Sequence, residues 1–284
     1  MHSLRMIVAH IANTLNSRDQ ARELIAAVLE CTPSAVSQRV VQDGSITNQQ
    51  ADAVHTAVTR LQRGMPFAYA VGNAAFRHLI LHVDERVLIP RPETELLIDH
   101  VLALTRTAPG GVAIDIGTGS GAIALALAQE GAFDRVVATD ISEDALQVAH
   151  ANAVRLAHAW RTTVEFRLGP DLEPVRDVRA TVIVSNPPYI APHEAASLPA
   201  LVRDWEPHTA LFADNGGQAR YEALLRDAPQ VLQPQGWLVL ECDSERAHDT
   251  AAIARAAGVY DQIVVHPDLT GRPRILVARY IGAP

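Results

Sequence analysis

The spacing of hydrophobic positions changes twice along the chain. Up to about residue 65, apolar residues recur at the three- and four-residue spacing of helices. Capping boxes at residues 17–20 and 47–50 open two such stretches, and Gly64 ends the second. The apolar positions behind the first box are Leu24, Ile25, Val28 and Leu29. We therefore expect a small helical bundle at the N-terminal end.

Residues 74–90 have the two-residue period of strands. Leu79, Leu81 and Val83 occupy alternate positions, and a second, largely apolar run, Arg86-Val87-Leu88-Ile89, follows. A β-hairpin or two short strands are expected here, as a linker between two domains.

From residue 111 onward, apolar runs of strand length alternate with stretches of helical period. Strands are expected at 112–116, 135–139, 163–168, 181–184, 237–241, 262–265 and 274–280, and helices at 120–129, 143–157, 221–232 and 245–257. Such alternation predicts an α/β domain with a mostly parallel sheet covered on both faces.

Composition narrows the class of protein. Hydrophobic residues make up 48% and charged residues 20%, and the formal net charge is −8. All 24 basic residues are arginine, and the acidic balance argues against broad affinity for nucleic acid. No apolar run has membrane-spanning length, and Cys31 and Cys242 are too few for a disulfide framework, so we expect a cytoplasmic protein.

His78 and His82 would lie about 13 Å apart along a strand, so no metal site is expected.

A glycine-rich loop follows the first strand of the α/β domain. It reads Gly117-Thr118-Gly119-Ser120-Gly121, and Asp140 closes the next strand. Glycines allow a ligand to approach the backbone, and a carboxylate at that position can bind ribose hydroxyls, so a nucleoside-containing cofactor is indicated. The spacing with Ala122 also fits a dinucleotide, whereas the loop with Gly121 and the preceding Asp115 resembles that of S-adenosylmethionine-dependent methyltransferases.

The sequence Asn186-Pro187-Pro188-Tyr189 follows the strand at 181–184. Alone it reads as a turn. In a parallel sheet, however, it meets the glycine loop at the same edge, where ligands bind. The Asn186 side-chain oxygen and the Pro187 carbonyl could accept both N–H groups of a planar amide, while Tyr189 packs on it. Proline stiffness would hold these acceptors in place.

This tetrapeptide resembles the (D/N)-P-P-(Y/F/W) motif of methyltransferases that modify planar NH₂ nitrogens. Residues 87–95, Val-Leu-Ile-Pro-Arg-Pro-Glu-Thr-Glu, resemble a signature of the HemK/PrmC family of protein-glutamine N5-methyltransferases. Residues 206–211 and 271–274 match two weaker stretches. Two places depart from the family pattern, at residues 215–218 and 242–243.

The resemblance implies a Rossmann-like methyltransferase fold with a seven-stranded sheet. It divides the chain into a substrate-recognition domain (1–73), a hairpin linker (74–90) and a methyltransferase domain (91–284). It implies S-adenosylmethionine as the cofactor and the glutamine of the Gly-Gly-Gln motif in peptide chain release factors as the substrate. The implied cofactor-binding residues are Gly117, Thr118, Gly119, Ser120, Gly121, Asp140, Asp171 and Asn186. Asn186, Pro187, Pro188 and Tyr189 would bind the glutamine, with Asn186, Pro187 and Tyr189 taking part in catalysis.

Three alternatives remain open on sequence alone. A ribosomal-protein glutamine methyltransferase would share the motifs. An adenine-N6 nucleic-acid methyltransferase would act on a similar NH₂ group, although the charge argues against direct binding of nucleic acid. A scaffold that binds the cofactor without catalysis would have no use for the amide acceptors.

Overall fold

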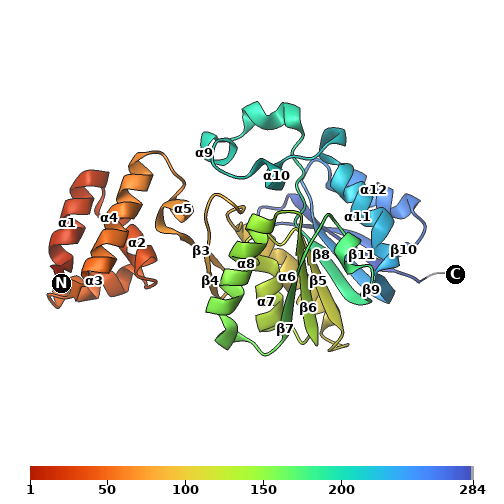
Figure 1. The fold of residues 1–284 in the computed structure, drawn as a ribbon. Helices are drawn as coiled ribbons and strands as arrows, with labels where there is room; N and C mark the ends of the chain where they lie inside the picture. The colour runs from red at the N-terminus through yellow and green to blue at the C-terminus, as the bar shows by residue number, and fades with distance from the viewer. Residues whose placement is uncertain (283–284) are drawn as a thin grey trace.

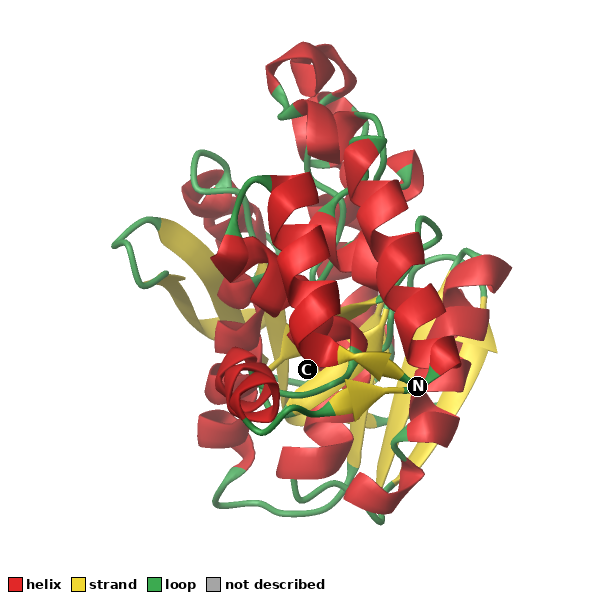
Figure 2. Cartoon of the chain, turned by 90° about the vertical axis from the view of Figure 1, so that its left-hand side faces the viewer, coloured by secondary structure: helices red, strands yellow, loops and turns green. Residues whose placement is uncertain are grey.

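A bundle of helices lies at one end of the molecule and is joined by a β-hairpin to a larger α/β domain (Figure 1). The computed structural model describes residues 1–282. The bundle comprises α1 (Leu4–Leu15), α2 (Arg18–Val28), α3 (Pro33–Val41), α4 (Asn48–Gln62) and α5 (Phe67–Val71). Strands β1 (His2–Ser3) and β2 (Ser45–Ile46) pair beside it and lie toward the viewer in Figure 2.

The bundle has a hydrophobic core of its own. Leu4, Ile11, Leu24 and Val54 are fully buried in it, each from a helix face of the predicted spacing. At the start of α4 both bonds of the capping box form, since Thr47 and Gln50 exchange side-chain and backbone hydrogen bonds. The bundle therefore forms as the helical periodicity predicts.

The hairpin consists of β3 (Asn73–Phe76) and β4 (Leu79–His82), which pair antiparallel. Phe76 and Leu81 are buried against the α/β domain rather than the bundle. The apolar run at 86–89 forms no strand. The Asp84 side chain accepts a hydrogen bond from the Arg86 backbone N–H, and this local turn replaces extended backbone.

The seven strands of the α/β domain form one sheet in the order β10-β11-β9-β8-β5-β6-β7. All neighbouring pairs from β9 to β7 are parallel, and β11 pairs antiparallel with both β9 and β10. The bounds are β5 (Val112–Ile116), β6 (Arg135–Asp140), β7 (Thr163–Leu168), β8 (Ala180–Ser185), β9 (Leu232–Glu241), β10 (Tyr260–Pro267) and β11 (Pro273–Tyr280). The predicted mostly parallel seven-stranded sheet is confirmed.

Helices cover both faces of the sheet (Figure 1). One face packs on α6 (Glu95–Thr105) and α7 (Ala122–Glu130), and α8 (Glu143–Arg155) contacts β6 and β7. The other face packs on α11 (Ala219–Asp227) and α12 (Ala247–Ala256). Successive residues such as Ala113 and Ile114 enter different cores, which is why these strands are apolar throughout. The predicted helix at 221–232 ends earlier, because a 3₁₀ turn at Ala228–Gln230 leads into β9.

Short helices connect β8 to α11 and lie above the carboxyl ends of the parallel strands (Figure 1). They are the 3₁₀ turn η4 (Pro192–Ser197), α9 (Ala200–Arg203), α10 (His208–Leu211) and the 3₁₀ turn η5 (Asn215–Gly217). Arg246 at the start of α12 ties this connection down, through a 2.5 Å ion pair with Glu194 and a hydrogen bond to the Gly216 carbonyl. We refer to residues 190–218 as the cap segment.

Candidate active site

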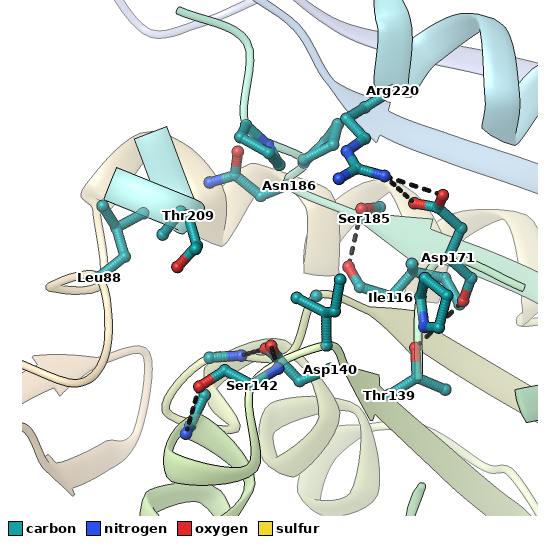
Figure 3. Close-up of a pocket in the computed structure, with 18 of the residues that line it drawn as sticks. Leu88, Ile116, Thr139, Asp140, Ser142, Asp171, Ser185, Asn186, Thr209 and Arg220 are labelled. Atoms are coloured by element: carbon teal, nitrogen blue, oxygen red, sulfur yellow. Dashed lines mark hydrogen bonds and ion pairs between the residues drawn. The ribbon is translucent and has the colours of Figure 1, made fainter. Parts of the chain in front are cut away.

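A cleft opens at the carboxyl ends of the parallel strands, beneath the cap segment (Figure 3). The space inside it, counted together with its open mouth, is about 830 Å³. Its walls come from the loops after β5, β6, β7 and β8, from residues 86–88 and from the cap segment. The glycine loop, the Asn-Pro-Pro turn and the stretches at 87–95 and 206–211 thus contribute to one cavity, whereas the stretch at 271–274 does not line it.

The glycine loop forms the floor of the cleft. Gly117 and Gly119 line it with φ values of 72° and 54°. A Cβ atom added to either residue would meet no other atom within 4 Å, so the space above their backbone is open to a ligand.

The other three residues of the loop do not line the cleft. The Thr118 hydroxyl donates to the carboxylate of Asp115 beneath it (2.7 Å). The Ser120 carbonyl accepts from the buried side chain of Asn152. Gly121 caps α7, where a Cβ would approach Ala149 at 3.3 Å. These three residues stabilise the conformation of the loop from the side that faces away from the cleft.

Asp115 is completely buried below the loop. Besides Thr118, its Oδ2 accepts the Ala124 backbone N–H at the start of α7. Burial raises the pKa of this carboxyl to about 7, against the lowering effect of these two hydrogen bonds. In the sequence, Asp115 stands out only as part of the pattern of the glycine loop. In the structure, its carboxylate connects β5 to the loop and to α7.

Asp140 ends β6 and lines the cleft (Figure 3). Its two carboxylate oxygens accept the backbone N–H groups of Gly119 and Ser142, each at 2.9 Å. Burial raises the pKa of Asp140, and these N–H groups oppose the increase. A carboxylate offers about four lone-pair sites, so acceptor capacity remains for ribose hydroxyls.

Asp171 also lines the cleft, after β7, but its carboxylate is already engaged. It forms an ion pair with Arg220 of α11, with Nη1 3.0 Å and 3.2 Å from the two oxygens (Figure 3). Sequence reasoning missed Arg220, because no local pattern links α11 to the loop after β7. Apolar residues complete this wall: Ile116, Ile141, Pro170 and Leu224. Apolar walls beside a carboxylate fit the adenosine part of S-adenosylmethionine.

Asn186 lies on the side of the cleft opposite Asp140 and Ser142 (Figure 3), and Pro187 and Pro188 line the cleft as well. Tyr189 does not line it. Its side chain is partly buried, and burial together with the nearby Glu241 raises the pKa of its hydroxyl to about 12.

The side-chain amide of Asn186 is held by a hydrogen bond to a buried residue. Its Nδ2 donates to the Thr94 hydroxyl at 3.1 Å, and that hydroxyl donates to Glu241 Oε2 at 2.7 Å. Within residues 1–282, no hydrogen bond is made to Asn186 Oδ1 or to the Pro187 carbonyl. Burial raises the pKa of Glu241 to about 7, although the Thr94 hydrogen bond opposes the increase. Thr94 belongs to the signature at 87–95, but neither its role nor that of Glu241 follows from sequence.

Two other motif stretches meet beside the cleft. Arg91 forms a 2.5 Å ion pair with the buried carboxylate of Glu206, which lies at the start of the 206–211 stretch. Burial raises the pKa of Glu206, and the arginine opposes the increase. This pair connects the segment before α6 to the cap segment.

The departures at 215–218 and 242–243 lie against the site without lining it. Asp243 accepts from Arg246 at 3.1 Å, so it helps to hold the arginine that anchors the cap segment. Gly217 has φ 86° and lies against the Tyr189 carbonyl oxygen. Cys242 is buried beside Leu240. Asp243 and Gly217 therefore help to hold the cap segment, which packs against the loop that carries Asn186.

Within residues 1–282, no three His, Cys, Asp or Glu side chains lie together in a way that could hold a metal ion. In the same range, no helix has the length and apolarity needed to span a bilayer.

Comparison with known proteins agrees with this geometry. The family described as "Methyltransferase small domain" matches residues 92–203. Among solved structures, a methyltransferase from Pyrococcus furiosus has a TM-score of 0.52 at 18% identity, covering 84% of this chain and 100% of that one. The hMettl16 catalytic domain has a TM-score of 0.58 at 18% identity, covering 84% and 83%. At this identity the likeness concerns the fold alone, and it confirms the Rossmann-like methyltransferase architecture.

Curated relatives are closer. A release factor glutamine methyltransferase of Koribacter versatilis is 37% identical over 94% of this chain and 93% of its own. Proteins of the same name from Cereibacter sphaeroides and Moorella thermoacetica are 37% and 40% identical, covering 93% and 78% of this chain and 91% and 77% of their own. The resemblance seen in the motifs is confirmed, and the chain belongs to the family of release factor glutamine methyltransferases.

Proposed function

We propose that this protein transfers a methyl group from S-adenosylmethionine to the side-chain amide nitrogen (N5) of the glutamine in the Gly-Gly-Gln motif of peptide chain release factors. The observation that carries the proposal is the position of Asn186 and Pro187. Their two oxygen acceptors, without partners among residues 1–282, border the same cleft as Asp140 and the glycine loop. We expect the reaction to take place in the cytoplasm, with no direct contact to nucleic acid.

An amide nitrogen is a weak nucleophile because its lone pair is delocalised. Asn186 Oδ1 and the Pro187 carbonyl oxygen would each accept one N–H of the glutamine amide and so fix the direction of the nitrogen lone pair. Pro187 and Pro188 restrict the backbone, so these acceptors need little reorganisation during the reaction. S-adenosylmethionine, when bound, supplies a sulfonium methyl carbon that takes the nitrogen lone pair as its bond to sulfur breaks, and one amide proton leaves to water.

The cofactor would be held mainly by Gly117, Gly119 and Asp140. Thr118, Ser120 and Gly121 would contribute by keeping the loop in shape, since none of them lines the cleft. The ion pair of Asp171 with Arg220 would border the adenine. Tyr189, which we expected to pack on the substrate amide, is better suited to supporting the turn at 186–188 from its partly buried position.

Recognition of the release factor would fall to the helical domain and the hairpin. A second groove lies where the two domains meet, and it combines groups of different character: Arg60, Arg63, Met65, Tyr69, Asp84, Glu85 and Trp205. Residues of α4, the linker and the cap segment thus line one groove, as a protein substrate that reaches into the cleft would require.

The test offers purified release factor, a ribosomal protein and DNA in parallel to the enzyme, with methyl-labelled S-adenosylmethionine. We expect label on the release factor alone, mapped by mass spectrometry to the glutamine of Gly-Gly-Gln, and its loss when that glutamine is replaced. Asn186→Ala should lower kcat by about a hundredfold or more, while cofactor affinity stays within about tenfold. Label on DNA or on the ribosomal protein would contradict the proposal.

A further inference from the structure

A chain of side-chain hydrogen bonds runs from Asn186 into the protein interior. Asn186 Nδ2 donates to Thr94 Oγ1 at 3.1 Å, and Thr94 Oγ1 donates to Glu241 Oε2 at 2.7 Å. Thr94 is 5% exposed and Glu241 is 2% exposed. Thr94 comes from the 3₁₀ turn η1 (Pro92–Thr94) and Glu241 from the end of β9, so two distant segments meet behind the cleft.

The direction of these bonds follows from counting protons. An ionised carboxylate can only accept, and a threonine hydroxyl has one proton to donate. The proton of Thr94 therefore goes to Glu241, which leaves only lone pairs on the hydroxyl oxygen. Those lone pairs can bind the NH₂ group of Asn186 but not its oxygen. The Asn186 amide is thus held with NH₂ toward Thr94, and its oxygen is left for another partner.

We infer that Thr94 and Glu241 are positioning residues that hold the Asn186 amide with its oxygen ready to accept an N–H group of the substrate amide. This inference rests on the proposed function. Without the pair, the Asn186 amide could turn by half a rotation and present its NH₂ group to the substrate, so that two donors would face each other.

The same count explains why position 186 carries asparagine. An aspartate there would require a proton from Thr94, whose single proton already serves Glu241. The charged and titratable groups around Glu241 include Arg274 of β11, Arg91 and Glu93 before α6, Tyr189 after β8, Tyr221 of α11 and the adjacent Cys242. Another carboxylate at 186 would add negative charge to a buried site that holds one already.

The first test compares Thr94→Val, Thr94→Ser and Glu241→Gln at about pH 8, above the Glu241 pKa of about 7. Valine keeps the shape of threonine without the hydroxyl, and glutamine, which offers Thr94 both a donor and an acceptor, no longer fixes the direction of the chain. We expect both to lower kcat on the order of ten- to a hundredfold. Thr94→Ser should recover most of that loss, because it keeps the hydroxyl.

A double variant separates proton direction from general damage to the fold. In the protein that carries both Asn186→Asp and Glu241→Gln, the new glutamine would donate to Thr94, and Thr94 would donate to the new carboxylate at position 186. All three groups are then paired again. We expect the double variant to exceed Asn186→Asp alone in kcat by about tenfold or more. If the fold-losses in kcat of the two single variants simply multiply in the double variant, the inference about proton direction is wrong.

Thr105→Val is a matched control, because Thr105 is a buried threonine on α6 whose hydroxyl, among residues 1–282, bonds only to the Val101 carbonyl of the same helix. It should leave kcat unchanged. Melting temperature and calorimetric affinity for S-adenosylmethionine, measured for every variant, should stay near those of the wild type. If the wild type does not methylate glutamine, the proposed function fails. If it does, and Thr94→Val and Glu241→Gln keep kcat within about twofold, only the positioning role is refuted.

Discussion

Asp140 combines two tasks at one residue. It accepts backbone N–H groups from the glycine loop and from the start of α8, and it borders the cleft at the place where ribose hydroxyls are expected. Its carboxylate therefore accepts hydrogen bonds that stabilise the loop even without a ligand. The shape of the loop and the affinity for the cofactor thus depend on the same two oxygens.

Replacing Asp140 by alanine should weaken the binding of S-adenosylmethionine more than it slows transfer at saturation. The two hydrogen bonds expected from the ribose hydroxyls to the carboxylate are lost, each contributing about 1.5–3 kcal/mol, so we expect affinity to fall by about a hundredfold or more. Isothermal titration calorimetry measures this directly. Asp19→Ala, at an exposed position of α2, is the control and should leave the affinity unchanged. Wild-type affinity in Asp140→Ala would refute the assignment.

At the scale of elements, the cap segment depends on two glycines of different kinds. Gly216 (φ 62°) has open space around it, whereas a Cβ at Gly217 (φ 86°) would overlap the Tyr189 carbonyl oxygen. Both need a left-handed backbone, but only Gly217 also needs to be small. The loop that carries Asn186 is thus packed directly against the cap segment.

Gly217→Ala should therefore do more damage than Gly216→Ala. At the exposed Gly216, alanine should cost only the penalty for a left-handed backbone, about 1–2 kcal/mol. At Gly217, displacement of the Tyr189 carbonyl adds to that penalty and should shift the turn at 186–188, so kcat should fall as well. Urea unfolding and steady-state kinetics of the two variants provide the comparison. If the two variants have equal stability and equal kcat, the close contact at Gly217 contributes nothing to stability or catalysis.

The sequence predicted elements well where the pattern is local and repeated. The strands that contribute to both cores read as continuous apolar runs, and the glycine loop and Asn186-Pro187-Pro188 follow strands whose parallel order places them at one edge. Residues 86–89 were wrongly expected to be extended, because the Asp84 turn depends on a side chain. The cap segment went without a prediction, since its short helices are fixed by distant partners such as Arg246.

The same limit applies to the site. Asp140 and Asn186 follow from their strands, but Thr94, Arg220 and Glu241 act through partners 92, 49 and 147 residues away in the sequence. No periodicity or spacing encodes such pairs. They can be found only once the sheet order is known.

At the scale of the whole molecule, the helical bundle and the sheet have separate hydrophobic cores. Asn73 Nδ2 donates to the Ala27 carbonyl, and Arg155 pairs with Glu30 at 3.1 Å, so polar contacts connect the bundle to the rest. A small separate apolar cluster around Tyr69 also joins α5 to Val87 of the linker and Val148 of α8. Damage to one core should therefore leave the other largely intact.

Leu24→Ala tests this independence, because Leu24 is fully buried in the bundle core. It should cost about 2–5 kcal/mol in that domain alone. Hydrogen exchange should rise in α1 to α4 and stay unchanged in β5 to β9. We expect KM for intact release factor to increase while affinity for S-adenosylmethionine is retained. Leu276→Ala, fully buried in the sheet core, is the matched control and should show the opposite pattern of exchange.

The bond between Thr94 and Glu241 has a consequence for biosynthesis. The two residues are 147 positions apart, and β11, which enters the sheet beside β9, lies later still in the chain. A growing polypeptide emerging from the ribosome can complete its N-terminal bundle early, but it lacks the carboxylate that orients Asn186 until synthesis is nearly finished. An enzyme that modifies a component of the translation machinery thus completes its own site only near the end of its translation.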